Sequence, residues 1–153
     1  AMKRLNQWDE AGELIGNLKI WHQPLKGVII DENDVPGLID ELPIIAILAT
    51  QANGRTEVSG AEELRVKECD RIHALCKNLK KMGADIEELQ DGFIINGPTP
   101  LKGANIETFH DHRIAMAFTI AGLVTNGDVV LDHPECASIS FPEFYDVLEN
   151  LKQ

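Results

Sequence analysis

The sequence predicts a mixed α/β (α+β) fold of repeated βαβαββ units, with helices covering one face of small mixed sheets. The first observation is an internal repeat, because Pro-Leu-Lys-Gly occurs at 24–27 and again at 100–103. The second is the shared order after each copy: a short β-like run, an Asp, an Ala/Ile-rich helical stretch and an Asn-Gly turn. We therefore expect unit A over about residues 17–96 and unit B over about residues 97–153.

Unit A is expected to contain two strands, two helices and a closing strand pair. Asp40 stands just before a helical run with Pro in its first turn, which indicates an N-cap. Apolar residues at helical spacing then predict a second helix, and Gly83 is expected to end it in the left-handed conformation. The strands are expected at 28–30, 56–58, 85–88 and 92–96, and the second helix at 72–82.

Unit B repeats the first four elements of this order. Strands are expected at 104–106 and 128–131, and Asp111 is expected to cap a helix that runs to Val124. A final helix with an apolar stripe follows, and Ser140 and Glu143 form a capping-box pattern at its start. Residues 2–16 are the least patterned part, and we interpret them as the end of a preceding helix and hairpin.

Composition excludes several classes of protein. The 153 residues carry a formal net charge of −11, which argues against a nucleic-acid partner or an anionic membrane surface. No apolar run approaches the ~20 residues of a membrane span, and no secretory signal follows the N-terminus, where Ala1 before Met2 suggests a cloning remnant. Three cysteines without a Cys-x-x-Cys pattern predict neither a disulfide framework nor a zinc site, and they favour a cytoplasmic location.

Charged residues gather at 62–72, before the second helix of unit A. Lys67 and Arg71 are four residues apart, so on a helix they would share one face with Glu68 beside them. An anion between the two cations would relieve their repulsion, and a carboxylate at that place can move protons. The alternative interpretation is a solvated helix start with paired charges.

A second charged motif is His110-Asp111-His112-Arg113. Two histidines without a third ligand nearby make a poor metal site. A helix N-terminus with Arg113 in its first turn is a better anion site, because free N–H groups and the helix dipole favour negative charge there. The alternative is that Asp111 only caps the helix and Arg113 is a surface charge. Asp40 occupies the corresponding place in unit A.

Four segments in this order resemble the C-terminal part of the 5-enolpyruvylshikimate-3-phosphate (EPSP) synthase family, the 3-phosphoshikimate 1-carboxyvinyltransferases. The resemblance implies two globular halves, each of three βαβαββ units, with the active site between them. About two units of one half are then present, and the motifs of the N-terminal half are absent. The related UDP-N-acetylglucosamine enolpyruvyl transferases share this fold but look less similar. The segments are Leu38–Pro43, Glu63–Ile72, Asp111–Ala117 and Ser140–Phe144.

The resemblance also implies a reaction and a set of residue roles. The enolpyruvyl group of phosphoenolpyruvate is transferred to the 5-hydroxyl of shikimate 3-phosphate and phosphate is released, without a metal or organic cofactor. Asp40 would accept the hydroxyl proton, Lys67 would contact the phosphorylated substrate and assist proton movement, and Glu68 would protonate the methylene carbon. Arg71 and Arg113 would bind the carboxylate or phosphate of phosphoenolpyruvate. Some members carry a Lys at the place of Ile139, so a contact from that loop is in question.

Two hypotheses follow for the chain as a whole. In the first, it is part of the synthase and is inactive without the other half, which supplies the cations that an acidic chain lacks. In the second, it is a binding or interaction module that keeps the fold without the chemistry. Because a unit of the half is missing, exposed apolar surface and self-association are expected in either case.

Overall fold

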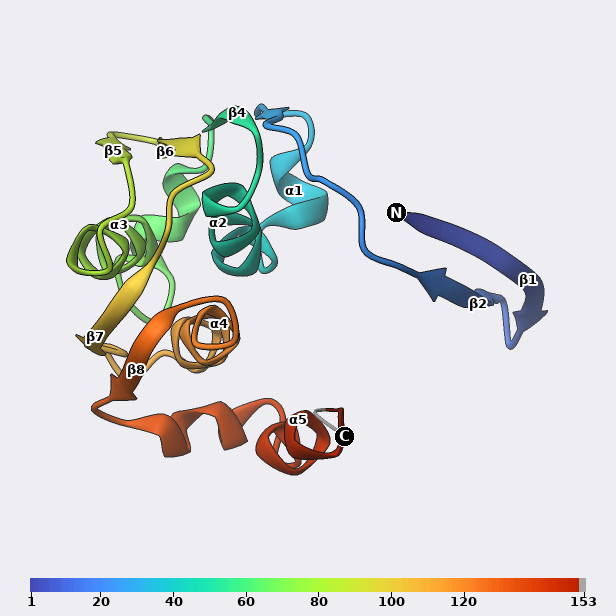
Figure 1. Ribbon diagram of the computed structural model, residues 1–153. Coiled ribbons are helices and arrows are strands. Elements are labelled where there is room, and N and C mark those ends of the chain that lie inside the picture. The colour runs from blue at the N-terminus through green and yellow to red at the C-terminus, as the bar shows by residue number, and fades with distance from the viewer. Residues whose placement is uncertain (152–153) are drawn as a thin grey trace.

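The computed structural model describes residues 1–151, and Figure 1 shows the path of the chain. The strands are β1 (Met2–Glu10), β2 (Glu13–Ile20), β3 (Ile29–Ile30), β4 (Gly54–Val58), β5 (Ile86–Leu89), β6 (Gly92–Gly97), β7 (Lys102–Ile106) and β8 (Asn126–Leu131). The helices are α1 (Val35–Leu38), α2 (Leu42–Thr50), α3 (Arg71–Lys81), α4 (His112–Ala121) and α5 (Phe144–Leu151), with 3₁₀ helices η1 (Glu62–Val66) and η2 (Pro134–Ile139).

Unit A forms a four-stranded sheet in the order β3-β4-β6-β5. Strands β3 and β4 are parallel, whereas β6 is antiparallel to both β4 and β5. The predicted hairpin between β5 and β6 is confirmed, with its turn at Gln90 and Asp91. Helix α3 begins after its N-cap Asp70, whose carboxylate accepts a hydrogen bond from the His73 N–H. Gly83 has φ +87°, which confirms the left-handed end of that helix.

Close contacts between backbone segments explain why the Pro-Leu-Lys-Gly segment is repeated. Each Pro-Leu-Lys-Gly segment runs parallel to an Asn-Gly turn: Lys26 pairs with Asn53, and Lys102 with Asn126. The glycine that follows each lysine lies so close to the opposite strand that a Cβ on Gly27 would meet the Arg55 carbonyl oxygen at 2.1 Å. The same contact at Gly103 would be 2.5 Å, against the Asp128 carbonyl oxygen. Both positions therefore require glycine.

Helices α2, α3 and α4 pack against one another, and in Figure 1 α2 and α3 lie below β4, β5 and β6 while α4 lies beside β8. Their apolar faces form the centre of the core, which explains why the Ala/Ile-rich stretches and the apolar stripe of α3 occur where they do. Helix α4 ends at Ala121, three residues before the expected end. Fully buried aliphatic and aromatic side chains of these helices include Leu42, Ile72, Leu75, Leu79, Ile114 and Phe118.

The two ends of the described chain differ from this core. Strands β1 and β2 form an antiparallel hairpin that stands apart in Figure 1, and β2 continues through residue 17. The hairpin in the interpretation of residues 2–16 is confirmed, whereas the structure has no helix within these residues. At the other end, α5 starts at Phe144, and Ser140 is the C-cap of η2, so the expected capping box does not form. Across residues 1–151, the helices are all too short or too polar to cross a bilayer.

We predict that Gly27→Ala lowers the free energy of unfolding by about 1–3 kcal/mol, because the new methyl group would overlap the Arg55 carbonyl. Gly37→Ala is the matched control, since no atom lies within 4 Å of its Cβ position and Ala favours the helix α1 that contains it. Urea unfolding of the two variants measures the difference. Equal stability of both variants would contradict the steric explanation of the repeat.

Candidate active site

The guanidinium group of Arg71 is the centre of the site. Arg71 is the first residue of α3, and its side chain is only 1% exposed. Its Nε lies 2.8 Å from Asp111 Oδ2, its Nη2 lies 2.6 Å from Glu68 Oε2, and its Nη1 lies 3.3 Å from Asp40 Oδ1. Three carboxylates from separate segments therefore meet at one buried cation.

Asp111 has two roles in this arrangement. Its side chain is 0% exposed, and the same carboxylate that contacts Arg71 accepts hydrogen bonds from the N–H groups of Arg113 and Ile114. The predicted N-cap of α4 is thus confirmed, and negative charge at this helix start also suits the helix dipole. Sequence reasoning did not find the contact with Arg71, because the capping pattern carries no information about a residue forty positions away.

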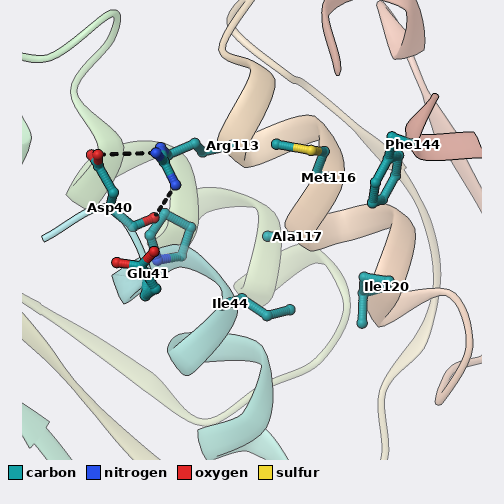
Figure 2. Close-up of a pocket in the computed structure, with 9 residues that line it drawn as sticks. Asp40, Glu41, Ile44, Arg113, Met116, Ala117, Ile120 and Phe144 are labelled. Atoms are coloured by element: carbon teal, nitrogen blue, oxygen red, sulfur yellow. Dashed lines mark hydrogen bonds and ion pairs between the residues drawn. The ribbon is translucent and has the colours of Figure 1, made fainter. Parts of the chain in front are cut away.

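Arg113 and Asp40 form the exposed side of the same cluster. Arg113 Nη2 donates to Asp40 Oδ2 at 2.9 Å, and Arg113 Nη1 donates to the Asp40 carbonyl oxygen at 3.0 Å (Figure 2). The side chain of Asp40 is 42% exposed and that of Arg113 is 30% exposed. Because Asp40 contacts both arginines, it connects the start of α2 with the starts of α3 and α4.

The expected N-cap role of Asp40 is wrong. Helix α2 begins at Leu42, its N-cap is Glu41, and that cap has no side-chain hydrogen bond. The carboxylate of Asp40 points instead to the two guanidinium groups, since an ion pair with a charged, partly buried donor is stronger than a bond to a neutral N–H. Helix α2 begins without this help because Pro43 suits its first turn.

The structure also corrects the expected pairing of Lys67 with Arg71. Helix η1 ends at Val66, Lys67 is extended with ψ −154°, and α3 starts only at Arg71. The two cations therefore do not share a helix face. Lys67 Nζ contacts Glu63 Oε1 at 2.5 Å, whereas Glu68 does lie beside Arg71. Of the five residues predicted for the site, the cluster brings together Asp40, Glu68, Arg71 and Arg113.

The electrostatics of the cluster favour a permanently charged Arg71. Burial by itself lowers the pKa of the guanidinium, but the hydrogen bond and charge of Asp111, then the charges of Glu68 and Asp40, raise that pKa above its ordinary value. Cys69 lies 3.6 Å from Asp111, and burial together with that carboxylate raises the pKa of its thiol to about 12. These surroundings favour the neutral thiol of Cys69 over the thiolate.

A small pocket opens beside Asp40 and Arg113 (Figure 2). Its volume is about 200 Å³, and its walls come from α2, α4 and the first residue of α5. Ile44, Met116 and Phe144 make most of it apolar, while Asp40 and Arg113 form a polar end. A carboxylate that can accept a proton therefore stands next to a cation that can bind an anion, at the edge of an apolar surface.

The histidines of the second motif do not converge. His110 stacks on His133 with ring centroids 4.1 Å apart, whereas His112 is buried on α4. Over residues 1–151, His, Cys, Asp and Glu side chains form no group of three that could hold a metal ion.

Comparison with solved structures identifies the fold. Over 99% of this chain and 32% of the other, the structure superimposes with a TM-score of 0.68 on the enolpyruvyl transferase NikO from Streptomyces tendae. The sequences are 16% identical, so that likeness concerns the fold alone. With the EPSP synthase from Acinetobacter baumannii, the TM-score is 0.92 at 40% identity, over 97% of this chain and 35% of that one. The chain has the fold of the enolpyruvyl transferases.

Sequence comparison identifies the family within that class. The model of the EPSP synthase (3-phosphoshikimate 1-carboxyvinyltransferase) family matches residues 12–148, and the chain belongs to this family. The 3-phosphoshikimate 1-carboxyvinyltransferase of Alkaliphilus oremlandii is 51% identical over 93% of the chain, and that of Sulfurihydrogenibium sp. is 46% identical over 97%. The chain spans about a third of the length of these relatives, 33% and 34%.

We predict that Asp111→Ala lowers the free energy of unfolding by about 3–5 kcal/mol, because it leaves the buried Arg71 without its main counter-charge. The control is Asp70→Ala, which removes the N-cap of α3 but no buried ion pair and costs about 1 kcal/mol. Chemical denaturation compares the two caps. A similar loss in both variants would show that Asp111 acts as a cap alone.

Proposed function

We propose that this chain provides one side of the active site of an EPSP synthase. In that reaction the enolpyruvyl group of phosphoenolpyruvate is transferred to the 5-hydroxyl of shikimate 3-phosphate and phosphate is released. The observation that carries the proposal is the cluster in which Asp40, Glu68, Arg71 and Arg113 meet, since it joins groups that move protons with groups that bind anions. Membership of the family supplies the reaction.

The chemistry assigns a separate task to each carboxylate. The 5-hydroxyl oxygen adds to the central carbon of phosphoenolpyruvate while the methylene carbon takes up a proton, which gives a tetrahedral intermediate. Asp40 accepts the hydroxyl proton, and its two arginine contacts hold its oxygens in a fixed orientation. Glu68 delivers the proton to carbon from a side chain that is 49% exposed. Loss of phosphate and of a methyl proton then restores the enol ether.

The two arginines differ in how they reach a substrate anion. Arg113 is 30% exposed and lines the pocket, so it can bind a carboxylate or phosphate directly. Within residues 1–151, the guanidinium group of Arg71 forms its hydrogen bonds with protein carboxylates, so we propose that an anion reaches it when Glu68 moves away from Nη2. We assign Arg113 the direct contact and Arg71 the role of holding Asp40 and Glu68 in place until that exchange.

Lys67 remains part of the proposal as a contact for shikimate 3-phosphate. Its side chain is 25% exposed, and its ammonium group is paired with Glu63, whose own side chain is 66% exposed. Exposed pairs of this kind are weak, so a substrate phosphate can replace Glu63 at small cost. We therefore expect Lys67 to leave Glu63 and join the site only when shikimate 3-phosphate binds.

The charge balance indicates that the rest of the longer protein completes the site. Asp40, Glu68 and Asp111 surround only two arginines, and the chain carries a formal charge of −11. Both substrates are anions, so this surface alone repels them. We propose that the two thirds of the relatives outside this match supply the remaining cations. The free thiols of Cys69, Cys76 and Cys136 agree with a cytoplasmic location.

We predict that the chain alone releases no measurable phosphate from the two substrates and binds shikimate 3-phosphate weakly or not at all. Isothermal titration calorimetry and a phosphate-release assay test this. Micromolar binding by the isolated chain would contradict the proposal that cations from another segment are required.

We predict that residues 12–148, grafted in place of the matching third of the Alkaliphilus oremlandii enzyme, give an active chimera. In that chimera, Asp40→Asn and Glu68→Gln should each lower kcat by roughly 100-fold or more, the usual contribution of a general acid or base. Glu87→Gln, an exposed carboxylate on β5, is the control and should leave kcat unchanged. Near-normal kcat in a folded Asp40 or Glu68 variant would show that this residue is not the proposed proton acceptor or donor. A chimera that folds but is inactive would support the alternative that the chain is a binding module.

A further inference from the structure

The segment that joins β7 to α4 contains two residues in an unfavourable backbone conformation. Phe109 and His110 have φ values of +54° and +55°, in the left-handed region that residues other than glycine rarely adopt. The Asp111 N–H donates to the Thr108 carbonyl oxygen at 3.0 Å, so these two residues form the centre of a tight turn. The turn ends at Asp111, the buried counter-charge of Arg71. Because strained backbone persists only where neighbouring contacts fix it, the turn requires anchors.

The first anchor is Asn78 on α3, which fixes the start of the segment. Its Nδ2 donates to the Glu107 carbonyl oxygen at 2.8 Å, and its Oδ1 accepts from the Glu107 N–H at 3.1 Å. Asn78 is 0% exposed and lies seven residues after Arg71, so both side chains project from one face of the helix. Helix α3 therefore holds the segment at both ends, through Glu107 and through Asp111.

The second anchor is the carboxylate of Asp132, which follows β8 and fixes the residue before the turn. Its Oδ1 accepts hydrogen bonds from the Thr108 N–H at 2.9 Å and from the Thr108 hydroxyl at 2.7 Å. That hydroxyl oxygen in turn accepts from the His110 N–H at 3.3 Å. Burial raises the pKa of Asp132, but the bonds from Thr108 and from the His133 N–H hold it below its ordinary value. The charged carboxylate is therefore the form that grips the turn.

The equivalent place in unit A shows that the fold alone does not require this carboxylate. The residue after β4 is Ser59, whose N–H donates to the Ile30 carbonyl oxygen at 3.0 Å. The Asp132 N–H makes the same bond with the Ile106 carbonyl oxygen at 3.1 Å. Either residue thus closes the parallel strand pair through its backbone. The carboxylate of Asp132 is an addition of unit B, and it acts on the turn that leads to Asp111.

We propose that Asp132 is a positioning residue, which holds the turn before α4 and thereby places Asp111 against the guanidinium group of Arg71. Arg71 in turn contacts Asp40 and Glu68, the two carboxylates assigned to proton transfer. Asp132 acts on the reaction through Asp111, and this part of the inference rests on the proposed function. The placement of Asp111 does not rest on it and is measured in the chain alone.

The first experiment uses Cys69 as a reporter for the position of Asp111. Its Sγ lies 3.6 Å from Asp111 Oδ2, and burial together with that carboxylate raises the pKa of the thiol. Because the thiolate is the reactive form, we expect Asp132→Ala to accelerate alkylation of Cys69 by iodoacetamide at pH 9 roughly tenfold or more, as Asp111 moves away. Peptide mass spectrometry follows each cysteine separately. Cys76, which is fully buried on α3, reports general opening of the fold.

Two further variants separate the possible causes. Asp132→Asn retains an oxygen that can accept from Thr108, so Cys69 should react nearly as slowly as in the parent chain. Asp128→Ala removes an exposed carboxylate of β8 and should leave the rate unchanged. An unchanged rate in Asp132→Ala, or equal acceleration of Cys69 and Cys76, overturns the inference. Equal reactivity of the Asp132→Asn and Asp132→Ala variants also overturns it, because the effect then comes from charge and not from the hydrogen bonds.

The second experiment tests the link to the reaction in the chimera described above. Asp132→Ala should lower kcat roughly tenfold or more, and Asp132→Asn should restore most of it, because catalysis depends on the alignment of the reacting groups. Asp128→Ala should leave kcat unchanged. Faster Cys69 alkylation with unaltered kcat in Asp132→Ala overturns the catalytic part of the inference. An inactive parent chimera contradicts the proposed function instead, and the alkylation rates then decide the placement of Asp111 by themselves.

Discussion

A guanidinium group with 1% exposure must be balanced by carboxylates, because removal of such a charge from water costs several kcal/mol. Arg71 meets this requirement with side chains from three other places in the chain: Asp40 before α2, Glu68 before α3 and Asp111 before α4. The starts of all three core helices are therefore tied to one cation. The same requirement aligns the residues proposed to move protons, so the stability of the core and the geometry of the site have a common origin.

The site carries more negative than positive charge, although the substrates that we propose for it are anions. Its carboxylates outnumber its arginines, and the chain as a whole is acidic. A surface of this kind holds its own arginines in defined orientations before a substrate arrives, which is useful for preorganisation. It also needs added positive charge to attract two anionic substrates. In our proposal, the residues of this chain supply the fixed orientation, and the rest of a longer enzyme supplies the attraction of substrate.

The repeat explains the order of the elements in the chain and shows how the two units differ in their strands. Unit A contains the parallel pair, the two helices and the antiparallel hairpin that covers them. Unit B has the parallel pair and its helices but no hairpin of its own in residues 1–151, while every residue of the β1–β2 hairpin is exposed. Each unit depends on strands that are distant in sequence. In the described residues, apolar side chains such as Ile20, Val130 and Leu151 are therefore exposed.

Local patterns in the sequence determined most of the secondary structure and the repeat. Three features could be predicted because they act within a few residues or follow from the repeat: the apolar period of α3, the cap at Asp111 and the Asn-Gly turns. The close strand contacts that require Gly27 and Gly103 became visible only in the structure. The tertiary structure decided the roles of the charges. Whether Asp40 caps a helix or binds arginine, and whether Lys67 shares a face with Arg71, depends on the position of a buried cation from another segment. Electrostatic pairing acts through space, and side chains far apart in sequence compete for it.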